Sequence, residues 1–419
     1  MREQIEGSQA VARTVARCRP EVIAAYPISP QTHIVEGLSD LVRTGELDRC
    51  EYLMVESEFG ALSACIGASA AGARTYTATS SQGLLFMAEA LFNASGLGLP
   101  IVMTVANRAI GAPINIWNDH SDAMAMRDSG WIQLYAESNQ EAADLHVQAF
   151  RLAERLSVPV MVCMDGFILT HAFEPVDLPS QEQVDDYLPA FTPQQALDPD
   201  DPVTIGAMVG PEAFTEVKYL MHAKQVQALD EIPRLADAFA EQFGRASGGL
   251  VRGYRTEDAE TVVVGLGSMR GTLEVVIDAL RDRGERVGVL GITCFRPWPK
   301  DEVREALRNA RRVVVVEKAF AVGAGGIVGQ NVRLALQGLP VEVYDVVAGL
   351  GGRPVTVASI GGLLDDVLAE RLDPLRLHFL GLDAGLVERE LLRSRGVDRP
   401  GPHAEHMLRD LGTVASRPV

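Results

Sequence analysis

The sequence predicts an α/β protein built around parallel β-sheets. Two continuous apolar runs, residues 100–106 and 158–164, have the composition of strands that are buried on both faces, which is typical of a parallel sheet. Helix-like and strand-like segments alternate with short connections in both halves of the chain, and this alternation favours doubly wound sheets. The length of 419 residues allows two or three domains.

The elements of the first half follow from this alternation. Its expected helices carry apolar or small residues at helical spacing, and its expected strands are short and apolar or β-branched. The helices are expected at residues 4–17, 32–44, 60–72 and 138–156, and the strands at residues 21–25, 52–56, 75–79, 100–106 and 158–164. Ser138 and Glu141 are expected to form a capping box at the start of the last helix.

The pattern changes after residue 172. Residues 173–202 hold six prolines among acidic and polar residues, so we expect an extended arm on the surface, which a partner could cover. Residues 216–243 are again expected to be helical. The expected organisation is a first domain at 1–243, a linker at 244–257, a second domain at 258–371 and a tail at 372–419.

The second domain repeats the alternation with shorter elements. Strands are expected at residues 261–265, 286–292, 312–317 and 341–347, and helices at residues 271–281, 300–309 and 327–336. The tail is rich in Leu, Arg and Pro and is expected to pack on another surface.

The composition excludes several classes of function. The formal net charge is −18, whereas a protein that binds nucleic acid or anionic lipid needs a basic face to neutralise phosphates. No run of about 20 largely apolar residues is present, so no membrane span is expected. The first residues contain no apolar leader, and we therefore expect a soluble, cytoplasmic protein.

The five cysteines lie far apart in the sequence, at positions 18, 50, 65, 163 and 294. No pair forms a CxxC motif, so the sequence predicts no disulfide framework, zinc ribbon or local iron–sulfur motif. The cysteines are expected to be small buried side chains in a reducing compartment.

Three patterns suggest chemistry but have ordinary structural explanations. Gly265-Leu-Gly-Ser268 follows a strand, but Arg270 stands where a dinucleotide-binding loop needs its third glycine, so we favour a tight turn. Asp119-His-Ser-Asp122 offers three metal-ligand types, yet consecutive residues seldom converge on one ion, and we expect them to cap a helix or bond loop backbone. His171 is expected to be hydrogen-bonded rather than ligating, and no metal-binding residue is assigned.

Two further positions are stronger candidates. Glu56 and Glu58 follow a predicted strand; they are either solvated charges or include a carboxylate that holds a proton on a ligand nitrogen in a dry pocket. Arg108 ends an apolar strand, and ligands of open α/β sheets bind outside the carboxyl ends of strands. Its guanidinium could grip a carboxylate with two parallel hydrogen bonds, or it could form an interface salt bridge.

A series of motifs connects these positions. In order along the chain they are Tyr26-Pro-Ile-Ser-Pro30, Glu56-Ser-Glu-Phe-Gly60, Thr77-Ala-Thr-Ser-Ser-Gln-Gly-Leu84, Asn107-Arg-Ala109, Pro113-Ile-Asn-Ile-Trp-Asn-Asp-His-Ser-Asp122, Arg127-Asp-Ser-Gly-Trp131, Asn139-Gln-Glu141 and Asp165-Gly-Phe167. This series resembles the alpha subunit of 2-oxoacid:ferredoxin oxidoreductases, the pyruvate:ferredoxin oxidoreductase family. Phe295-Arg-Pro-Trp-Pro299 and Gly349-Leu-Gly-Gly-Arg353 are similar to weaker motifs of the family's second domain.

The resemblance implies a fold and an activity. The fold would be a thiamine diphosphate-binding domain of the pyrimidine type, followed by a transketolase C-terminal-like α/β domain. The complex would decarboxylate a 2-oxoacid with thiamine diphosphate, pass electrons through iron–sulfur clusters to ferredoxin or another acceptor, and transfer the acyl group to coenzyme A. Pyruvate, a branched oxoacid and an aromatic oxoacid such as phenylglyoxylate are all compatible substrates.

The resemblance also implies roles for individual residues. Glu58 would bond the aminopyrimidine ring of thiamine and favour its imino tautomer. Ser29 stands where the family usually has threonine, and together with Arg108 it would bind the substrate as a catalytic residue. Gln31-Thr32 replaces a serine pair that often follows the second proline of that motif, which leaves the substrate open. The remaining cofactor contacts would come from Pro27, Ser81 and Gln82.

Other parts of such an enzyme are missing from the sequence. Met164-Asp-Gly166 lacks the preceding glycine and the following asparagines of a Mg²⁺–diphosphate segment, and no cluster-binding cysteines are present. We therefore expect a beta subunit that shares the thiamine diphosphate and supplies Mg²⁺, with a gamma and a ferredoxin-like delta subunit; the clusters would lie on these partners. Two alternatives stay open: a non-catalytic scaffold subunit, and a nicotinamide-binding subunit that uses Gly265–Ser268.

Overall fold

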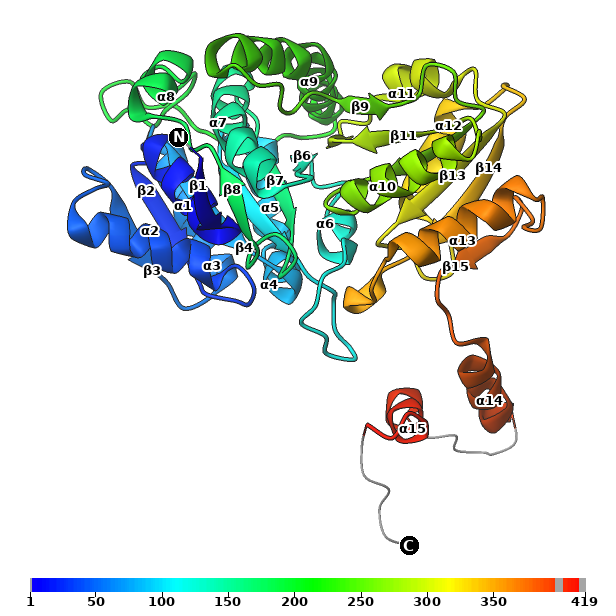
Figure 1. The fold of residues 1–419 in the computed structure, drawn as a ribbon. Helices are drawn as coiled ribbons and strands as arrows, with labels where there is room; N and C mark the ends of the chain where they lie inside the picture. The colour runs from blue at the N-terminus through cyan, green and yellow to red at the C-terminus, as the bar shows by residue number, and fades with distance from the viewer. Residues whose placement is uncertain (1, 396–401, 414–419) are drawn as a thin grey trace, which may run out of the picture.

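A computed structural model describes residues 2–395 and 402–413. Two open sheets stand side by side, with helices on the faces of both (Figure 1). The seven-stranded sheet has the order β12-β6-β7-β5-β4-β2-β3, and the six-stranded sheet has the order β15-β14-β13-β10-β11-β9. The predicted α/β class with parallel sheets is confirmed.

The first sheet is parallel except for one edge strand. Its strands are β2 (Val22–Ala25), β3 (Glu51–Met54), β4 (Thr75–Thr79), β5 (Val102–Asn107), β6 (Ile132–Tyr135), β7 (Val160–Asp165) and β12 (Cys294–Arg296). β4, β5 and β7 are buried at every residue, as their apolar runs predict. β12 comes from the second half of the chain and pairs antiparallel with β6, so the two halves share this sheet.

The helices of the first half cover both faces of this sheet. They are α1 (Gly7–Arg17), α2 (Thr32–Thr44), α3 (Glu58–Ala70), α4 (Ser81–Phe86), α5 (Ala88–Leu97), α6 (Ser121–Ala125), α7 (Asn139–Leu156), α8 (Gln181–Tyr187) and α9 (Phe214–Phe243). Ser138 caps α7 by accepting from the Glu141 N–H. The Glu141 carboxylate instead accepts from the backbone of Glu137 and Gly248, so the predicted capping box is only half formed.

The second sheet is parallel apart from β9. It contains β9 (Val251–Tyr254), β10 (Thr261–Gly265), β11 (Val287–Ile292), β13 (Arg312–Glu317), β14 (Glu342–Val347) and β15 (Leu377–Phe379). Its helical segments are α10 (Met269–Asp282), α11 (Lys300–Leu307), α12 (Ile327–Ala335), the 3₁₀ turn η1 (Leu350–Gly352) and α13 (Val357–Leu368). Every strand and helix predicted between residues 261 and 347 is present, with shifts of one or two residues at the ends.

Three segments differ from the sequence-based expectation because strands pair across long distances. Residues 4–6 belong to strand β1 (Glu3–Glu6), which pairs antiparallel with β8 (Phe173–Val176), so the first helix begins at Gly7. The expected arm therefore starts with a strand, and it continues into α8. The expected linker contains β9, which pairs with β11. Short edge strands of this kind take their stability from distant partners that local patterns do not reveal.

The tail also contributes to the second sheet. β15 pairs parallel with β14, so residues 377–379 belong to this sheet. α14 (Ala384–Arg395) and α15 (His403–Asp410) then lie apart from both sheets, in contact with each other (Figure 1). Among the described residues, no helix is both long and apolar enough to cross a membrane.

A buried ion pair joins the two halves. Asp165 at the end of β7 accepts from Lys318 Nζ at 2.7 Å and lies 2.6 Å from His120 Nε2. Ser268 at the start of the second half donates to the same carboxylate at 2.5 Å. Burial alone would raise the pKa of Asp165, but the Lys318 ammonium and the His120 ring outweigh it and lower the pKa well below its usual range.

We expect Lys318→Met to lower the free energy of unfolding of the full chain by about 3–5 kcal/mol, because Asp165 would stay buried without its cation. The matched control is Arg283→Met, which removes an exposed pair with Asp365 and should cost less than about 1 kcal/mol. Because the pKa of Asp165 is lowered, its contribution is present above about pH 4 and declines as the pH falls below that value. Equal losses in chemical denaturation of both variants would contradict this assignment.

Candidate active site

The predicted site residues gather at one edge of the first sheet. The motifs that contain Ser29, Glu58, Ser81 and Arg108 follow β2, β3, β4 and β5, in that order, and all four strands are parallel. Since the carboxyl ends of parallel strands meet at the same edge, residues far apart in the sequence become neighbours.

Arg108 and Ser29 are in direct contact. Arg108 Nη1 donates to the Ser29 carbonyl at 2.9 Å, and Nε donates to the Asn115 carbonyl at 3.1 Å. The Ser29 contact uses the backbone, so its exposed hydroxyl stays available. No described residue accepts from Nη2 of Arg108. Burial lowers the pKa of Arg108, while the nearby Asp122 carboxylate opposes that effect.

Asp122 holds two of these segments together. Its Oδ2 accepts from the backbone N–H of Ser81 at 2.9 Å and of Arg108 at 3.0 Å, and its Oδ1 accepts from Asn107 Nδ2 at 2.8 Å. The side chain is fully buried, and burial raises the pKa of Asp122 to about 6. Asp122 thus fixes where α4 and the Arg108 segment lie relative to each other.

This role is not evident from the sequence. Asp119, His120 and Asp122 are almost consecutive, but in the structure their side chains contact different partners. Asp119 accepts from the Gly351 N–H at 3.0 Å, and His120 pairs with Asp165. The expectation that these residues bond loop backbone fits Asp119 and Asp122, but sequence spacing gives no sign of which distant backbone they reach.

Glu58 carries a buried carboxylate at the start of a helix. It lies in the first turn of α3, after Ser57, whose hydroxyl accepts from the Gly60 N–H, and it is 8% exposed. Among the described residues, none donates a hydrogen bond to its carboxylate. Burying a charged group without a partner is costly, and such groups are common at functional sites. Glu56, two residues earlier, is exposed.

Glu58 packs closely against Gly83 and Thr79. A Cβ atom on Gly83 would lie 2.6 Å from both Glu58 Oε1 and Thr79 Oγ1, so only glycine fits here. Thr79 Oγ1 is itself buried without a hydrogen-bond partner in the described part of the chain. In the described part of the chain, this carboxylate and this hydroxyl are two neighbouring polar groups without a hydrogen-bond partner, and such groups mark a candidate binding site.

The other predicted cofactor contacts point in different directions. Ser81 has a left-handed backbone, and its hydroxyl donates to the Ala109 carbonyl at 2.5 Å, so this side chain is turned into the protein. The half-buried Gln82 amide lies against Gly111, where a Cβ would be 2.5 Å from Nε2. Pro27 is exposed.

The second half of the chain closes against this edge. Asn115 Nδ2 donates to the Gly351 carbonyl at 3.1 Å, and the Gly352 N–H donates to the Asn118 carbonyl at 2.7 Å. Gly352 has a φ of 82°, and a Cβ there would lie 2.4 Å from the Trp117 Cβ. The two motifs that contain these residues therefore dock on each other.

Gly265–Ser268 forms a tight turn, as expected. Gly267 has a φ of 67°, and a Cβ at this position would lie 2.9 Å from Asp165 Oδ1. The loop is therefore packed against the buried ion pair that joins the two halves.

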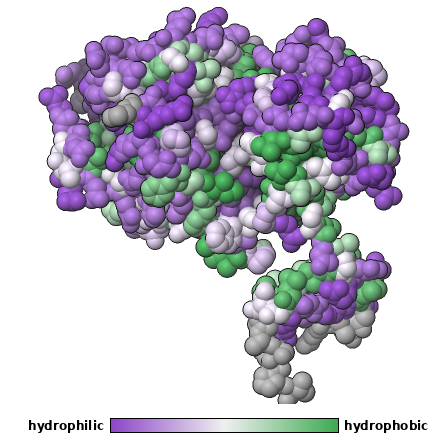
Figure 2. Space-filling view, in the orientation of Figure 1, coloured by the Kyte–Doolittle hydropathy of each residue, from purple (hydrophilic) through white to green (hydrophobic). Residues whose placement is uncertain are grey.

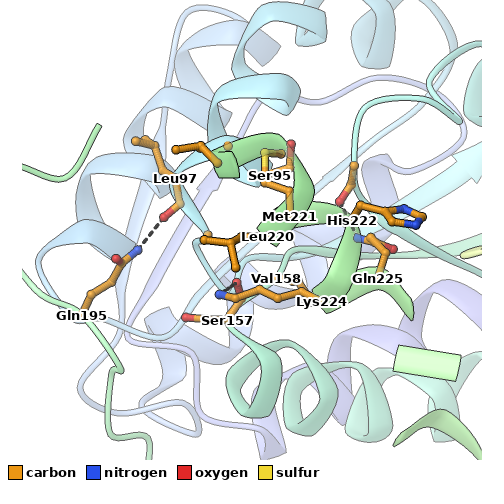
Figure 3. Close-up of a pocket in the computed structure, with 14 residues that line it drawn as sticks. Ser95, Leu97, Ser157, Val158, Gln195, Leu220, Met221, His222, Lys224 and Gln225 are labelled. Atoms are coloured by element: carbon orange, nitrogen blue, oxygen red, sulfur yellow. Dashed lines mark hydrogen bonds between the residues drawn. The ribbon is translucent and has the colours of Figure 1, made fainter. Parts of the chain in front are cut away.

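A separate cavity of about 360 Å³ lies between the end of α5 and the first half of α9 (Figure 3). Leu97, Leu220 and Met221 give it an apolar wall, and Lys224 Nζ donates to the Ser157 carbonyl at 3.5 Å. None of the predicted site residues lines this cavity, so we assign no catalytic role to it.

Comparisons with known proteins agree with this architecture. Residues 13–236 match the family described as pyruvate flavodoxin/ferredoxin oxidoreductase, thiamine diphosphate-binding, and residues 259–360 match pyruvate:ferredoxin oxidoreductase core domain II. The chain is 51% identical to pyruvate synthase subunit PorA of Methanosarcina barkeri, over 86% of this chain and 91% of that protein. It is 38% identical to ketoisovalerate oxidoreductase subunit VorA of Pyrococcus horikoshii, over 88% and 94%.

Solved structures share the fold at low sequence identity. The 2-oxoglutarate:ferredoxin oxidoreductase of Magnetococcus marinus, solved with 2-oxoglutarate, coenzyme A and succinyl-CoA bound, matches with a TM-score of 0.64 and 20% identity. The match covers 87% of this chain and 65% of that one. A split-gene transketolase matches with a TM-score of 0.51 and 14% identity, over 88% of this chain and 99% of that one. The chain belongs to the pyruvate:ferredoxin oxidoreductase family, as an alpha subunit of the 2-oxoacid:ferredoxin oxidoreductases that carries their thiamine diphosphate-binding domain.

Proposed function

We propose that this chain supplies the proton-holding carboxylate and the substrate-binding arginine for the oxidative decarboxylation of a 2-oxoacid with coenzyme A. The products are acyl-CoA and CO₂, and the electrons pass to ferredoxin or another acceptor. The observation that carries the proposal is the buried Glu58 carboxylate, which has no donor among the described residues and packs against Gly83 at the start of α4.

Glu58 fits one edge of thiamine diphosphate. Its carboxylate would share a proton with a nitrogen of the pyrimidine ring, in a dry setting that strengthens such a hydrogen bond. Thr79, which like Glu58 lies against Gly83, would be beside the same ring, and Gln82 and Pro27 stay proposed contacts with other parts of the cofactor. When bound, thiamine diphosphate supplies the electron sink for loss of CO₂, which no side chain can provide.

Arg108 and Ser29 would bind the 2-oxoacid. The two bonds from Nε and Nη1 to backbone carbonyls fix the guanidinium plane, and Nη2 is left to meet the substrate carboxylate. The exposed Ser29 hydroxyl lies beside it on the same turn. We propose pyruvate as the substrate, because the relatives named pyruvate synthase are more similar to this chain than those named ketoisovalerate oxidoreductase.

The remaining parts of the reaction would come from partner subunits. Asp165 already accepts from Lys318 and Ser268 and pairs with His120, so it is not available to Mg²⁺. The five cysteines form no CxxC pair, and burial raises the pKa of Cys50 and Cys65 to about 12, so neither is an activated thiol. We therefore place the Mg²⁺–diphosphate site and the clusters on beta, gamma and ferredoxin-like delta subunits. Free thiols fit a cytoplasmic location.

Exposed apolar side chains on β3, α3, α4, α5 and the loop after Arg108 support a shared site. They are Leu53, Met54, Phe59, Phe86, Phe92 and Ile114, each at least 37% exposed. Figure 2 shows hydrophobic surface along the lower edge of the first half, where α3 and α4 lie. An apolar surface of this kind beside an incomplete site suits a beta subunit that completes it.

Glu58→Gln should lower the rate of 2-oxoacid decarboxylation in the assembled complex by at least about a hundredfold, because an amide cannot hold the proton. Glu56→Gln is the matched control, since Glu56 is exposed, and it should leave the rate unchanged. Size-exclusion chromatography should show both complexes intact. Full activity of Glu58→Gln would favour a scaffold role instead.

Arg108→Ala should raise the KM for the 2-oxoacid at least about tenfold, which corresponds to the loss of one charge-assisted hydrogen bond. The KM for coenzyme A should stay unchanged in the same steady-state assay. If both KM values rise equally, Arg108 does not face the oxoacid.

Asp122→Asn should also raise the KM for the oxoacid, because its amide N–H₂ would oppose N–H donors that now meet a carboxylate oxygen. Because the pKa of Asp122 is raised, the free energy of unfolding should fall as the pH rises from about 4 to about 6. The Asp122→Asn variant should not show this fall. Asp128→Asn, an exposed change, is the control. If Asp122→Asn leaves both the KM for the oxoacid and the pH dependence of unfolding unchanged, Asp122 does not have this positioning role.

A further inference from the structure

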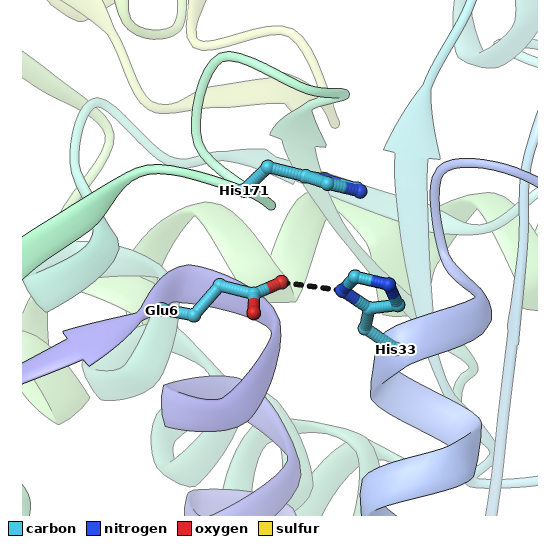
Figure 4. Close-up of side chains that lie close together, drawn as sticks. All are labelled: Glu6, His33 and His171. Atoms are coloured by element: carbon cyan, nitrogen blue, oxygen red, sulfur yellow. Dashed lines mark hydrogen bonds and ion pairs between the residues drawn. The ribbon is translucent and has the colours of Figure 1, made fainter.

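A second group of polar side chains lies where three separate segments meet (Figure 4). Glu6 ends β1, His33 lies in the first turn of α2, and His171 lies in the connection between β7 and β8. Glu6 Oε1 is 2.6 Å from His33 Nδ1, and the centroids of the His33 and His171 rings are 4.7 Å apart. One ligand atom from each of the three residues lies within 4.8 Å of the other two.

The donor set is one that zinc prefers. Two imidazoles and one carboxylate form a common three-residue set, with water in a fourth position. Bond lengths of about 2.0–2.2 Å place tetrahedral ligand atoms roughly 3.3 Å apart. The ligand atoms of the three residues are 2.6 to 4.8 Å apart, a range that includes this value. Small rotations of the side chains would therefore accommodate an ion. The His33 side chain is 44% exposed, which leaves a path for the ion and for water.

The backbone holds the ligands in place before any ion binds. The Ser8 N–H donates to the Thr170 carbonyl at 2.9 Å, and the Gly7 N–H donates to the Ala172 carbonyl at 3.0 Å. These bonds tie the segment after Glu6 to the segment on both sides of His171. Gln9 Nε2 donates to the His33 carbonyl at 3.2 Å and connects the third segment.

The His171 ring is also oriented by a neighbour. Its Nδ1 lies 2.7 Å from the Thr170 hydroxyl, which accepts from the Phe167 N–H at 2.8 Å. When Nδ1 carries the proton and donates it to Thr170, the lone pair of Nε2 is free for a metal. A hydrogen bond at the other ring nitrogen is the usual way in which proteins orient a histidine ligand.

We propose that Glu6, His33 and His171 bind one divalent transition-metal ion of the zinc class, with water completing the coordination. The ion would tie β1 to α2 and to the β7–β8 connection. Phe167 in that connection packs on Trp117, with ring centroids 4.9 Å apart, so the ion would also brace the loop that follows Arg108. This site is independent of the proposed thiamine chemistry.

The test is a zinc titration of the full chain, stripped with a chelator, in competition with a chromophoric chelator. The wild-type chain should bind one zinc ion, and its melting temperature should rise with zinc concentration. His33→Gln and His171→Gln should each weaken binding at least about tenfold and abolish that rise. Glu6→Gln keeps the shape of the cluster and should weaken binding as well.

His403→Gln is the matched control, because it alters another His–Glu group, in which His403 and His406 contact Glu390. It should bind zinc as the wild type does. The proposal is overturned if His33→Gln and His171→Gln, shown by circular dichroism to be folded, keep the wild-type affinity. It is also overturned if His403→Gln alone abolishes binding, or if the wild-type chain binds no zinc.

Discussion

A buried carboxylate needs a donor, and three carboxylates at one edge of the first sheet meet that requirement differently. Asp165 takes its charge partner from the second half of the chain, through Lys318. Asp122 takes backbone N–H groups from the segments that follow β4 and β5. Glu58 finds no donor among the described residues, although it is almost as buried. The contrast separates two carboxylates that have protein partners from one that has no donor in the described part of the chain, which we propose binds a ligand.

The two halves of the chain are coupled through this same edge. β12 extends the first sheet, Lys318 neutralises Asp165, and the Gly349–Arg353 turn docks on the loop that follows Arg108. The position of the arginine therefore depends on contacts from both halves. The second half of the chain thus helps to position the segment that contains Arg108.

Much of this could be predicted from the sequence, and several of the failures share one cause. Buried parallel strands such as β5 and β7 can be predicted from the sequence because both of their faces are apolar. The motifs that contain Glu58 and Arg108 could be placed because they directly follow predicted strands. β1, β8 and β9 were missed because each is a short edge strand whose partner lies far away in the sequence. The role of Asp122 was missed for the same reason, since its donors belong to segments 14 and 41 residues away. The motifs and the family resemblance point to Glu58, Ser29 and Arg108, whereas the Arg108–Ser29 contact and the burial of Glu58 are evident only from the fold.

The central claim is that the Glu58 carboxylate is kept without a protein donor so that a thiamine ring can provide one. A structure of the assembled complex with thiamine diphosphate tests this most directly, by the distance from the Glu58 carboxylate to the nearest pyrimidine nitrogen. The account predicts a distance within hydrogen-bonding range, with the Gly83 backbone against the ring. A pyrimidine ring that rests elsewhere, with Glu58 bonded to a side chain of a partner subunit, would contradict it.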